Sequence, residues 1–305
     1  MTGLKIKKSQ KPVLIVISGP TAVGKTDTGI KLAKVLNSEI ISADSRQFYK
    51  ELQIGTAVPL HEEMQGIKHH FIGNLSIHDY YNVSKFEIEV LELLKQLFKK
   101  NEYAILLGGS GFYINAVCKG IDELPDADES VRDKLNFEFS KNGIEYLQNK
   151  LKRLDPEFYT IVDKSNHKRL MRAIEVCVTT GKTFSSLRVN KITLRDFDII
   201  KIGLNRDRPE LFDRINNRVD IMINNGLVEE ARSLFPFRKL NALNTVGYKE
   251  LFEYFENKVS LEQTITNIKT NTRRYAKRQL TWFKKDESIK WFHPDDIGKI
   301  VQVIL

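Results

Sequence analysis

The sequence predicts an α/β protein in which a parallel sheet carries helices on both faces and an all-helical domain interrupts the core. Apolar strands alternate with amphipathic helices over the first 120 residues, a glycine-rich loop joins the first strand to the first helix, and strand patterns are absent from 121 to 195. Strand–helix alternation with short connections is typical of a doubly wound parallel sheet. We therefore expect a core of residues 1–120 and 196–305 and an inserted helical domain of residues 121–195.

The first part of the core has the clearest patterns. The expected elements are a strand at Val13–Ile17, a helix at 24–37, a strand at Glu39–Ser42, a helix at 84–100 and a strand at Tyr103–Leu107. The first strand is continuously apolar, as a strand covered on both faces should be. Ser84 and Glu87 have the spacing of a capping box, which predicts the start of the long helix.

The remaining elements are mostly helical. We expect helices at 128–141, 143–154 and 166–180, a strand at Phe197–Leu204, and helices at Arg208–Asn225, Leu227–Phe235 and 260–285. Gly143 and Gly181 lie where glycines commonly end helices. Ser260 and Gln263 have the spacing of a second capping box, at the start of the last helix.

Composition restricts the class of protein. Lysine and arginine number 48 against 39 acidic residues, so the net charge of +9 favours a polyanionic partner. The two cysteines, Cys118 and Cys177, form no disulfide framework or zinc motif, which fits a reducing, cytoplasmic location. No apolar run approaches the ~20 residues of a membrane span, so no membrane association is expected.

The loop after the first strand has the full phosphate-binding pattern GxxxxGK[ST] in a strand–loop–helix context, which makes the core P-loop NTPase-like. Its expected diphosphate- or triphosphate-binding residues are Gly19, Pro20, Thr21, Ala22, Val23, Gly24, Lys25 and Thr26. Backbone N–H groups and the helix N-terminus attract phosphate oxygens, and Lys25 adds a point charge. The Thr26 hydroxyl is the expected ligand of a magnesium ion.

A second candidate follows the Glu39–Ser42 strand. The strand at Tyr103–Leu107 ends in Gly-Gly-Ser-Gly and lacks the aspartate with which ordinary P-loop NTPases organise magnesium and water. Asp44 instead follows a strand and is expected in the crevice beside the loop, where it could hold magnesium or accept a proton. The pattern also fits a simple turn capped by Asp44 and Ser45.

Basic residues cluster in three places. Residues 263–285 contain no Asp or Glu and seven Lys or Arg residues, with Arg274 and Arg278 four apart, which indicates a polyanion-binding helix or a solvated basic face. A second cluster comprises His167, Lys168, Arg169 and Arg172, and a third comprises Arg214 and Arg218. Phosphate contacts or surface salt bridges explain these two clusters equally well.

Taken in order, these motifs resemble the bacterial tRNA dimethylallyltransferase family almost from end to end. The P-loop alone is generic, but the ordered set is specific. It consists of Gly19–Thr26, Asp44–Tyr49, Ile54–Ala57, Gly108–Tyr113, Arg169–Glu175 with Thr180–Lys182, Arg214–Met222, Gly247–Glu250 and Ala276–Phe283.

The resemblance implies transfer of a dimethylallyl group from dimethylallyl diphosphate to the exocyclic amine of adenosine 37, beside the anticodon of tRNAs that read U-initial codons. The products would be N6-isopentenyladenosine and diphosphate. Asp44 would be the general base, Thr26 would bind Mg²⁺, and Lys25 and Arg218 would stabilise charge on the diphosphate. The adenine would be flipped into the crevice. Apart from the resemblance, no coiled-coil or exposed apolar stripe stands out in the sequence, so a monomer is expected.

The resemblance also implies where the tRNA anticodon stem-loop binds. The inserted domain would grip the stem-loop, and His69 matches a family histidine near the active site without an assigned role. The implied tRNA contacts are Asp44, Ser45, Arg46, Gln47, Ser110, Arg132, Lys168, Arg169, Leu170, Met171, Arg172, Gly247, Tyr248, Arg274, Lys277, Arg278 and Gln279.

Three other functions remain open from the sequence. An isopentenyltransferase acting on free adenine nucleotides would use the same loop but would not need the inserted domain or the basic helix. A small-molecule kinase would consume ATP, and a non-catalytic RNA-binding protein would form no product.

Overall fold

The computed structural model describes residues 11–126, 128–189 and 192–305. The chain divides into two compact units. The first comprises the chain up to Cys118 together with Leu194–Leu305, and the second is Lys119–Thr193. Within the described residues, no helix has the length and apolar character needed to cross a membrane.

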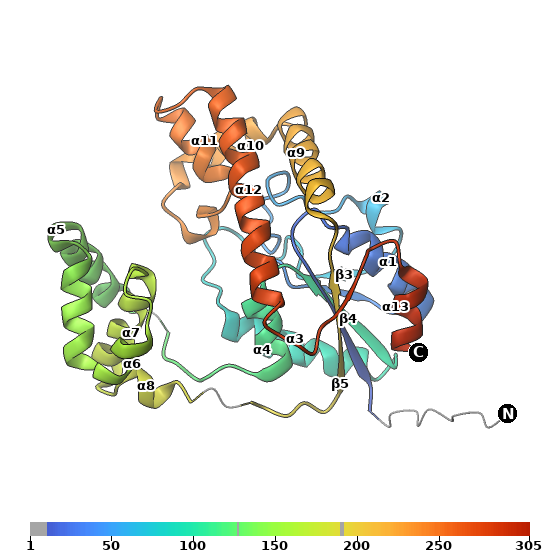
Figure 1. Ribbon diagram of the computed structural model, residues 1–305, viewed down its shortest axis with the longest axis horizontal. Helices are drawn as coiled ribbons and strands as arrows, with labels where there is room; N and C mark the ends of the chain where they lie inside the picture. The colour runs from blue at the N-terminus through green and yellow to red at the C-terminus, as the bar shows by residue number, and fades with distance from the viewer. Residues whose placement is uncertain (1–10, 127, 190–191) are drawn as a thin grey trace. The chain divides into compact units, whose positions relative to one another are not determined.

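The first unit is built on a six-stranded sheet, in which every neighbouring pair of strands is parallel (Figure 1). The strand order is β3-β2-β4-β1-β5-β6. The strands are β1 (Val13–Ser18), β2 (Ile40–Ser42), β3 (His69–His70), β4 (Tyr103–Gly108), β5 (Asp198–Leu204) and β6 (Lys290–Phe292). The predicted parallel sheet is thus confirmed, and β1 lies near its centre with its carboxyl end pointing to the phosphate loop.

Helices cover both faces of this sheet, as predicted. Side chains of β1 alternate between two apolar cores because successive residues of a strand point to opposite faces. Val13, Ile15 and Ile17 pack with α1 (Lys25–Leu36), α9 (Arg208–Asn224) and α13 (Ile297–Ile304). Leu14 and Val16 pack with α3 (Val83–Leu97) and α4 (Gly111–Lys119).

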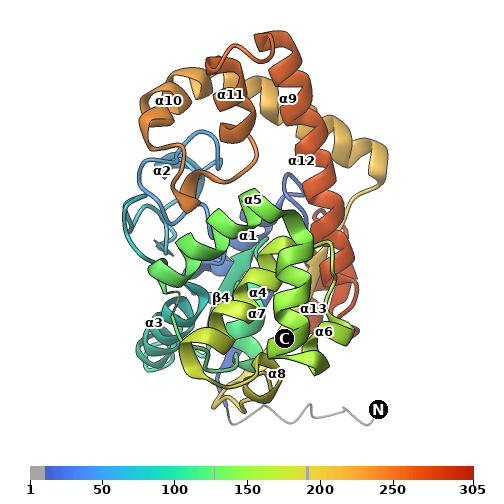
Figure 2. The ribbon, with the colours of Figure 1, turned by 90° about the vertical axis from the view of Figure 1, so that its left-hand side faces the viewer.

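A third core lies beyond the carboxyl ends of the strands. It joins α9 and α12 (Leu261–Phe283) to α10 (Leu227–Leu234) and α11 (Tyr248–Phe255). Figures 1 and 2 show α10 and α11 beside the first half of α12, whose second half descends to the sheet. Ser260 caps α12 as predicted, because its hydroxyl accepts the Gln263 N–H at 3.2 Å.

The second unit consists of helices in its described part: α5 (Glu129–Leu154), α6 (Pro156–Ile161), α7 (His167–Thr180) and α8 (Phe184–Leu187). Gly181 ends α7 in the left-handed conformation, as predicted. Gly143 departs from helical geometry inside α5, with φ 70° and ψ −169°, so it separates the two helical segments expected on either side. Cys177 in this unit and Cys118 in the first are both buried.

One helix start was predicted wrongly. Helix α3 begins at Val83 because Asn82 is its N-cap, and the Asn82 side chain accepts the Lys85 N–H at 2.9 Å. Asparagine is as good an N-cap as serine, so the earlier residue defines the helix end. Glu87, expected in the capping box, instead pairs with Arg195 at 2.6 Å.

The short elements α2 (His61–Met64), α6, α8, β3 and β6 were not predicted, nor were α4, α11 and α13. The turns at Phe235–Phe237 and Asn241–Leu243 are short 3₁₀ helices.

Candidate active site

The phosphate loop lies between the end of β1 and the start of α1. Gly24 precedes the helix with φ 108°, a conformation that glycine adopts without strain. A Cβ on Gly19 would lie 2.6 Å from the Leu204 carbonyl oxygen, so the loop approaches β5 closely only because this residue is glycine. The Lys25 ammonium donates to the carbonyl oxygens of Gly19 at 3.1 Å and Pro20 at 2.8 Å. The loop therefore curls around the lysine and holds it in place.

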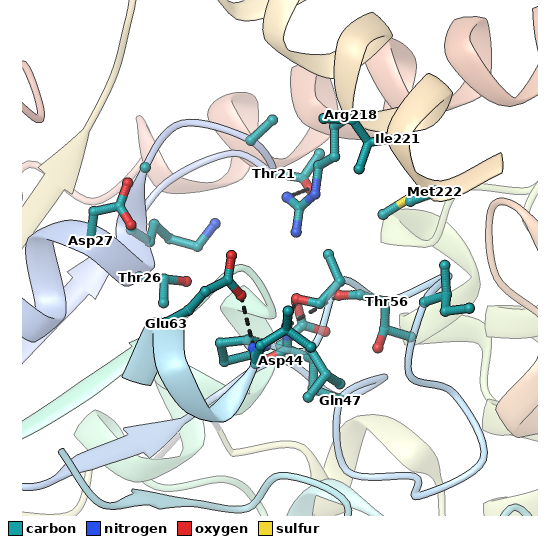
Figure 3. Close-up of a pocket in the computed structure, with 18 of the residues that line it drawn as sticks. Thr21, Thr26, Asp27, Asp44, Gln47, Thr56, Glu63, Arg218, Ile221 and Met222 are labelled. Atoms are coloured by element: carbon teal, nitrogen blue, oxygen red, sulfur yellow. Dashed lines mark hydrogen bonds between the residues drawn. The ribbon is translucent and has the colours of Figure 1, made fainter. Parts of the chain in front are cut away.

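A cavity of about 620 Å³ opens beside this loop, which forms one wall. Another wall comes from residues 53–60, and a third from α9. Figure 3 shows the Arg218 guanidinium pointing into the cavity from α9, across from Asp44 and Glu63. Arg218 donates to the Thr21 hydroxyl at 3.3 Å. Ile221 and Met222 make the same side of the cavity partly apolar.

Two half-buried cations, Lys25 and Arg218, line this cavity. Burial lowers the pKa of Lys25 to about 8, although the negative charge of Asp44 opposes the shift. Burial also lowers the pKa of Arg218, against the charges of Asp44 and Glu63. Desolvated cations with fixed geometry are stabilised by an incoming anion. The cavity therefore suits a diphosphate.

Two further arginines brace the phosphate loop from outside the cavity's centre. The Arg214 Nε donates to the Ala22 carbonyl at 2.8 Å, and the Arg206 Nε donates to the Val23 carbonyl at 2.9 Å. Arg206 also pairs with Glu210, one turn along α9. The sequence pattern singled out Arg214 but missed Arg206. Its position two residues after β5, beside β1 in the sheet, is the signal that could have identified it.

Asp44 lies at the carboxyl end of β2, as predicted, and its side chain faces the cavity. One of its carboxylate oxygens accepts the Arg46 N–H at 3.1 Å, so the residue forms a turn and lines the cavity at once. The Ser110 hydroxyl accepts the Ser45 N–H at 3.0 Å, which ties this turn to the end of β4.

Arg46 and Gln47 are held by backbone carbonyls. The Arg46 guanidinium donates to the carbonyls of Asn241 at 2.9 Å and Ala242 at 3.0 Å. The Gln47 amide donates to Thr56 and Ala57, both at 3.1 Å. Gln47 therefore fixes the loop that forms the second wall of the cavity.

A smaller cavity of about 100 Å³ shares Thr21, Asp44 and Arg218 with the larger one. Its other side is formed by Tyr275 of α12 and the turn at Thr245–Gly247. Burial raises the pKa of Tyr275, and the Asp44 charge adds to the shift, which keeps the phenol neutral. Asp44 thus lines both cavities, and the neutral Tyr275 phenol lies in the wall of the smaller one.

Glu230 clamps the loop that forms the second wall, and sequence reasoning missed it. Its carboxylate accepts three successive backbone N–H groups, from Gln53 and Ile54 at 2.9 Å and from Gly55 at 3.0 Å. The buried Tyr248 hydroxyl donates to the same carboxylate at 2.6 Å. A Cβ on Gly55 would lie 2.6 Å from the Tyr248 ring, so the glycine permits this contact.

Replacing Glu230 by alanine is expected to lower the free energy of unfolding by about 3 kcal/mol, because several N–H groups and a buried hydroxyl lose their acceptor. Urea denaturation monitored by circular dichroism measures the change. Glu229→Ala, at an exposed neighbouring position of α10, is the control and should stay near the parent stability. Equal stabilities of the two variants would show that the clamp contributes little.

The residues implied as tRNA contacts fall into different environments. Arg274, Lys277 and Arg278 are exposed and line an open groove on α12 with Trp282 and Lys285. Tyr248 is fully buried, and Gly247 lies on the wall of the small cavity. Gln279 is buried beneath the exposed face of α12, with contacts that are described below.

In the second unit, Lys168 and Arg169 are exposed at the start of α7, whereas Leu170 and Met171 belong to its core. Arg132 and Arg172 both pair with the fully buried carboxylate of Glu175, at 2.5 and 3.0 Å. Both arginines keep about a third of their side-chain surface exposed, which leaves room for a further anion.

His69 lies on the edge strand β3. Its Nδ1 contacts the Ile67 carbonyl oxygen at 2.8 Å, and burial lowers its pKa, so the ring is neutral near pH 7. His70 pairs with Glu39 at 2.5 Å.

The side chains around the phosphate loop offer few ligands for magnesium. Among the residues that the structure describes, no group of three or more His, Cys, Asp or Glu side chains could hold a metal ion. Mg²⁺ in phosphate-binding enzymes commonly keeps several waters and takes few protein ligands beside substrate phosphates. The Thr26 hydroxyl and the Asp44 carboxylate both line the large cavity, so the residues present fit a metal held mainly by the substrate.

The parallel sheet and the loop at the end of its central strand define an α/β protein of the P-loop class, with a cationic cavity beside the loop. Residues 47–286, more than half of the chain, match the family model described as IPP transferase. The chain belongs to this family.

The relatives agree with this assignment. A "tRNA dimethylallyltransferase" of Christiangramia forsetii is 54% identical over 286 residues, which cover 94% of this chain and 95% of the relative. "tRNA dimethylallyltransferase 1" of Bacteroides fragilis is 48% identical and covers 95% and 97%. The crystal structure of a full-length tRNA isopentenylpyrophosphate transferase from Bacillus halodurans is 36% identical, with a TM-score of 0.71 and 96% of each chain covered.

A eukaryotic dimethylallyltransferase, described as acting on tRNA, is also similar in structure. It has a TM-score of 0.72 at 28% identity, and the match covers 89% of this chain and 69% of the other.

Proposed function

We propose that the protein transfers the dimethylallyl group of dimethylallyl diphosphate to the exocyclic amine of adenosine 37 in tRNA. The products are N6-isopentenyladenosine and diphosphate. The observation that carries this proposal is the position of Asp44 between a cavity with two half-buried cations and a second, smaller space. Relatives named for this reaction, matched over nearly their whole length, support the choice of substrates.

We propose a role for each group, supported by its place around the cavity. The diphosphate binds to the phosphate loop beside Lys25 and Arg218, and the allyl chain lies against apolar side chains such as Ile221 and Met222. The adenine amine attacks the allylic carbon, the carbon–oxygen bond to the diphosphate breaks, and Asp44 takes the proton that the amine loses. The two cations stabilise the negative charge that develops on the leaving diphosphate.

Magnesium belongs to the same proposal. When bound through Thr26 and the diphosphate, it would supply further positive charge to the leaving group. We propose that the protein acts as a monomer. Since tRNA is the acceptor, we place the protein in the cytoplasm.

We propose that the RNA backbone binds to the α12 groove and to the exposed basic start of α7 in the inserted domain, which grips the anticodon stem-loop. On α12 the exposed cations Arg274, Lys277, Arg278 and Lys285 surround Trp282, which is 40% exposed and could stack on a base. Arg273 and Lys269, by contrast, are engaged by Asn216 and Asp220 of α9. This division assigns only part of the basic helix to RNA.

Reversing Arg274 and Arg278 to glutamate is expected to weaken binding of an anticodon stem-loop and to flatten its salt dependence. Each lost phosphate contact should reduce the slope of log K against log salt by about 0.7–0.9. Fluorescence anisotropy at several salt concentrations measures the binding constant and this slope. Reversal of the exposed Lys99 and Lys100 changes net charge equally and should leave the slope intact. An unchanged slope in the α12 variant would show that this basic face of α12 is solvated and does not contact RNA phosphates.

One assay tests the whole function. The protein and Mg²⁺ are incubated with labelled dimethylallyl diphosphate and either an unmodified anticodon stem-loop or free AMP. Label in the stem-loop but not in AMP supports the proposal, and label in AMP would identify a free-nucleotide enzyme. Hydrolysis of ATP in a parallel sample, without any prenyl transfer, would identify an ordinary nucleotide site.

A further inference from the structure

Gln279 joins two loops that are far apart in the sequence. It lies on α12, is only 6% exposed and uses both ends of its amide. Its Oε1 accepts the Thr21 N–H of the phosphate loop at 2.8 Å, and its Nε2 donates to the Gly109 carbonyl at 3.0 Å. The side chain therefore sets the spacing between the phosphate loop and the end of β4.

The neighbouring residues allow Gln279 little freedom to move. A Cβ on Gly109 would lie 2.2 Å from the Gln279 Nε2, so the contact requires glycine at position 109. On the far side, the Thr21 hydroxyl accepts a hydrogen bond from Arg218. Thr21 is thus held by α12 through its backbone and by α9 through its side chain.

This geometry separates Gln279 from its helical neighbours. Lys277 and Arg278 are exposed and line the open groove, whereas Gln279 points to the opposite side of α12, into the protein. The resemblance implied a tRNA contact for all three residues. The structure instead gives Gln279 two intramolecular partners, and these occupy both of its polar atoms.

We propose that Gln279 is a positioning residue for the diphosphate site: it holds Thr21, and through Thr21 the phosphate loop and Arg218, in the geometry that receives the diphosphate. The inference rests on the proposed function, because it specifies how that site is kept in shape. Backbone N–H groups of a phosphate loop bind well only when the loop is preorganised. Without Gln279, the Thr21 N–H would lose its acceptor, and the phosphate loop would shift to pair this N–H with another one.

The test compares two variants with the full-length protein. Gln279→Met keeps the length of the side chain but removes both hydrogen bonds. Gln279→Glu still accepts the Thr21 N–H but cannot donate to Gly109. Gln263→Met is the matched control, because Gln263 is exposed on the same helix and its amide donates to Asn267 at 2.9 Å, away from the phosphate loop. Calorimetry measures affinity for inorganic pyrophosphate with Mg²⁺, and anisotropy measures affinity for the stem-loop.

We expect Gln279→Met to weaken pyrophosphate binding about tenfold, with a similar rise in KM for the prenyl donor and unchanged stem-loop affinity. Gln279→Glu should show a loss at least as large, because it also adds a negative charge beside the phosphate loop. If the methionine variant does not fold, unchanged pyrophosphate affinity of the glutamate variant overturns the inference. Unchanged pyrophosphate affinity, a loss confined to RNA affinity, or equal losses for both ligands would each overturn the inference. Failure of the parent protein to bind pyrophosphate would instead refute the proposed function.

Discussion

Replacing Asp44 by asparagine is expected to lower the rate of prenyl transfer by about 10²–10⁴-fold while RNA binding is retained. The amide cannot accept the proton that the adenine amine releases. Its oxygen can still accept the Arg46 N–H, so the turn at the end of β2 should keep its shape. Single-turnover transfer to a stem-loop, with the enzyme in excess, measures the chemical step separately from product release.

The control is Asp213→Asn, which removes an exposed carboxylate on α9 and should leave the rate unchanged. If the Asp44 variant retained the parent rate, another group or solvent would have to take the proton. If its RNA affinity fell in parallel with the rate, Asp44 would contribute to acceptor binding as well as to proton transfer.

The second large effect is expected at Lys25. Lys25→Met should lower the transfer rate by about 10²–10³-fold, the usual consequence of losing one preorganised group that stabilises developing charge. It should also weaken pyrophosphate binding. Lys31→Met, at an exposed position on α1, is the matched control.

Because the pKa of Lys25 is lowered, pyrophosphate binding and the stability of the free protein should change with pH in opposite directions. Pyrophosphate binding to the parent protein should weaken as pH rises through about 8, because the ammonium loses its charge. The stability of the free protein should instead rise between pH 8 and 10.5, since the unfolded chain binds this proton more tightly than the folded protein does. Calorimetry and urea denaturation across this range measure the two trends. Lys25→Met should abolish this contribution to both.

The central part of the fold could be predicted because its signals are local. β1 is a continuous apolar run, and the pattern that follows it defines both a loop and the start of α1. The edge strands β3 and β6 carry no such signal. They have only two and three residues, and both contain polar side chains, so neither forms an apolar run. They pair with neighbouring strands because the tertiary fold brings the chain there.

The residues of the site also separate into those that the sequence predicts and those whose contacts it does not. Lys25 and Thr26 follow from a motif, Asp44 from its place after a strand, and Arg218 from a family resemblance. Glu230 and Gln279 could not be assigned their contacts, because they bind backbone groups more than 150 residues away in the chain. No spacing rule predicts contacts of that kind, and only the folded structure shows which loops they restrain.

The ends of the second unit meet, and this has a consequence for folding. The Thr193 N–H donates to the Lys119 carbonyl at 2.8 Å, so the inserted chain leaves and returns at one point. The strands β1 and β5 pair across this insertion, which makes the sheet dependent on distant contacts and therefore slow to form. If the helical unit folds first, it shortens the loop that this pairing must close, and each halving of a flexible loop saves about 0.6 kcal/mol of closure entropy. A folded insertion with adjacent ends therefore adds little to the entropy cost of pairing β1 with β5.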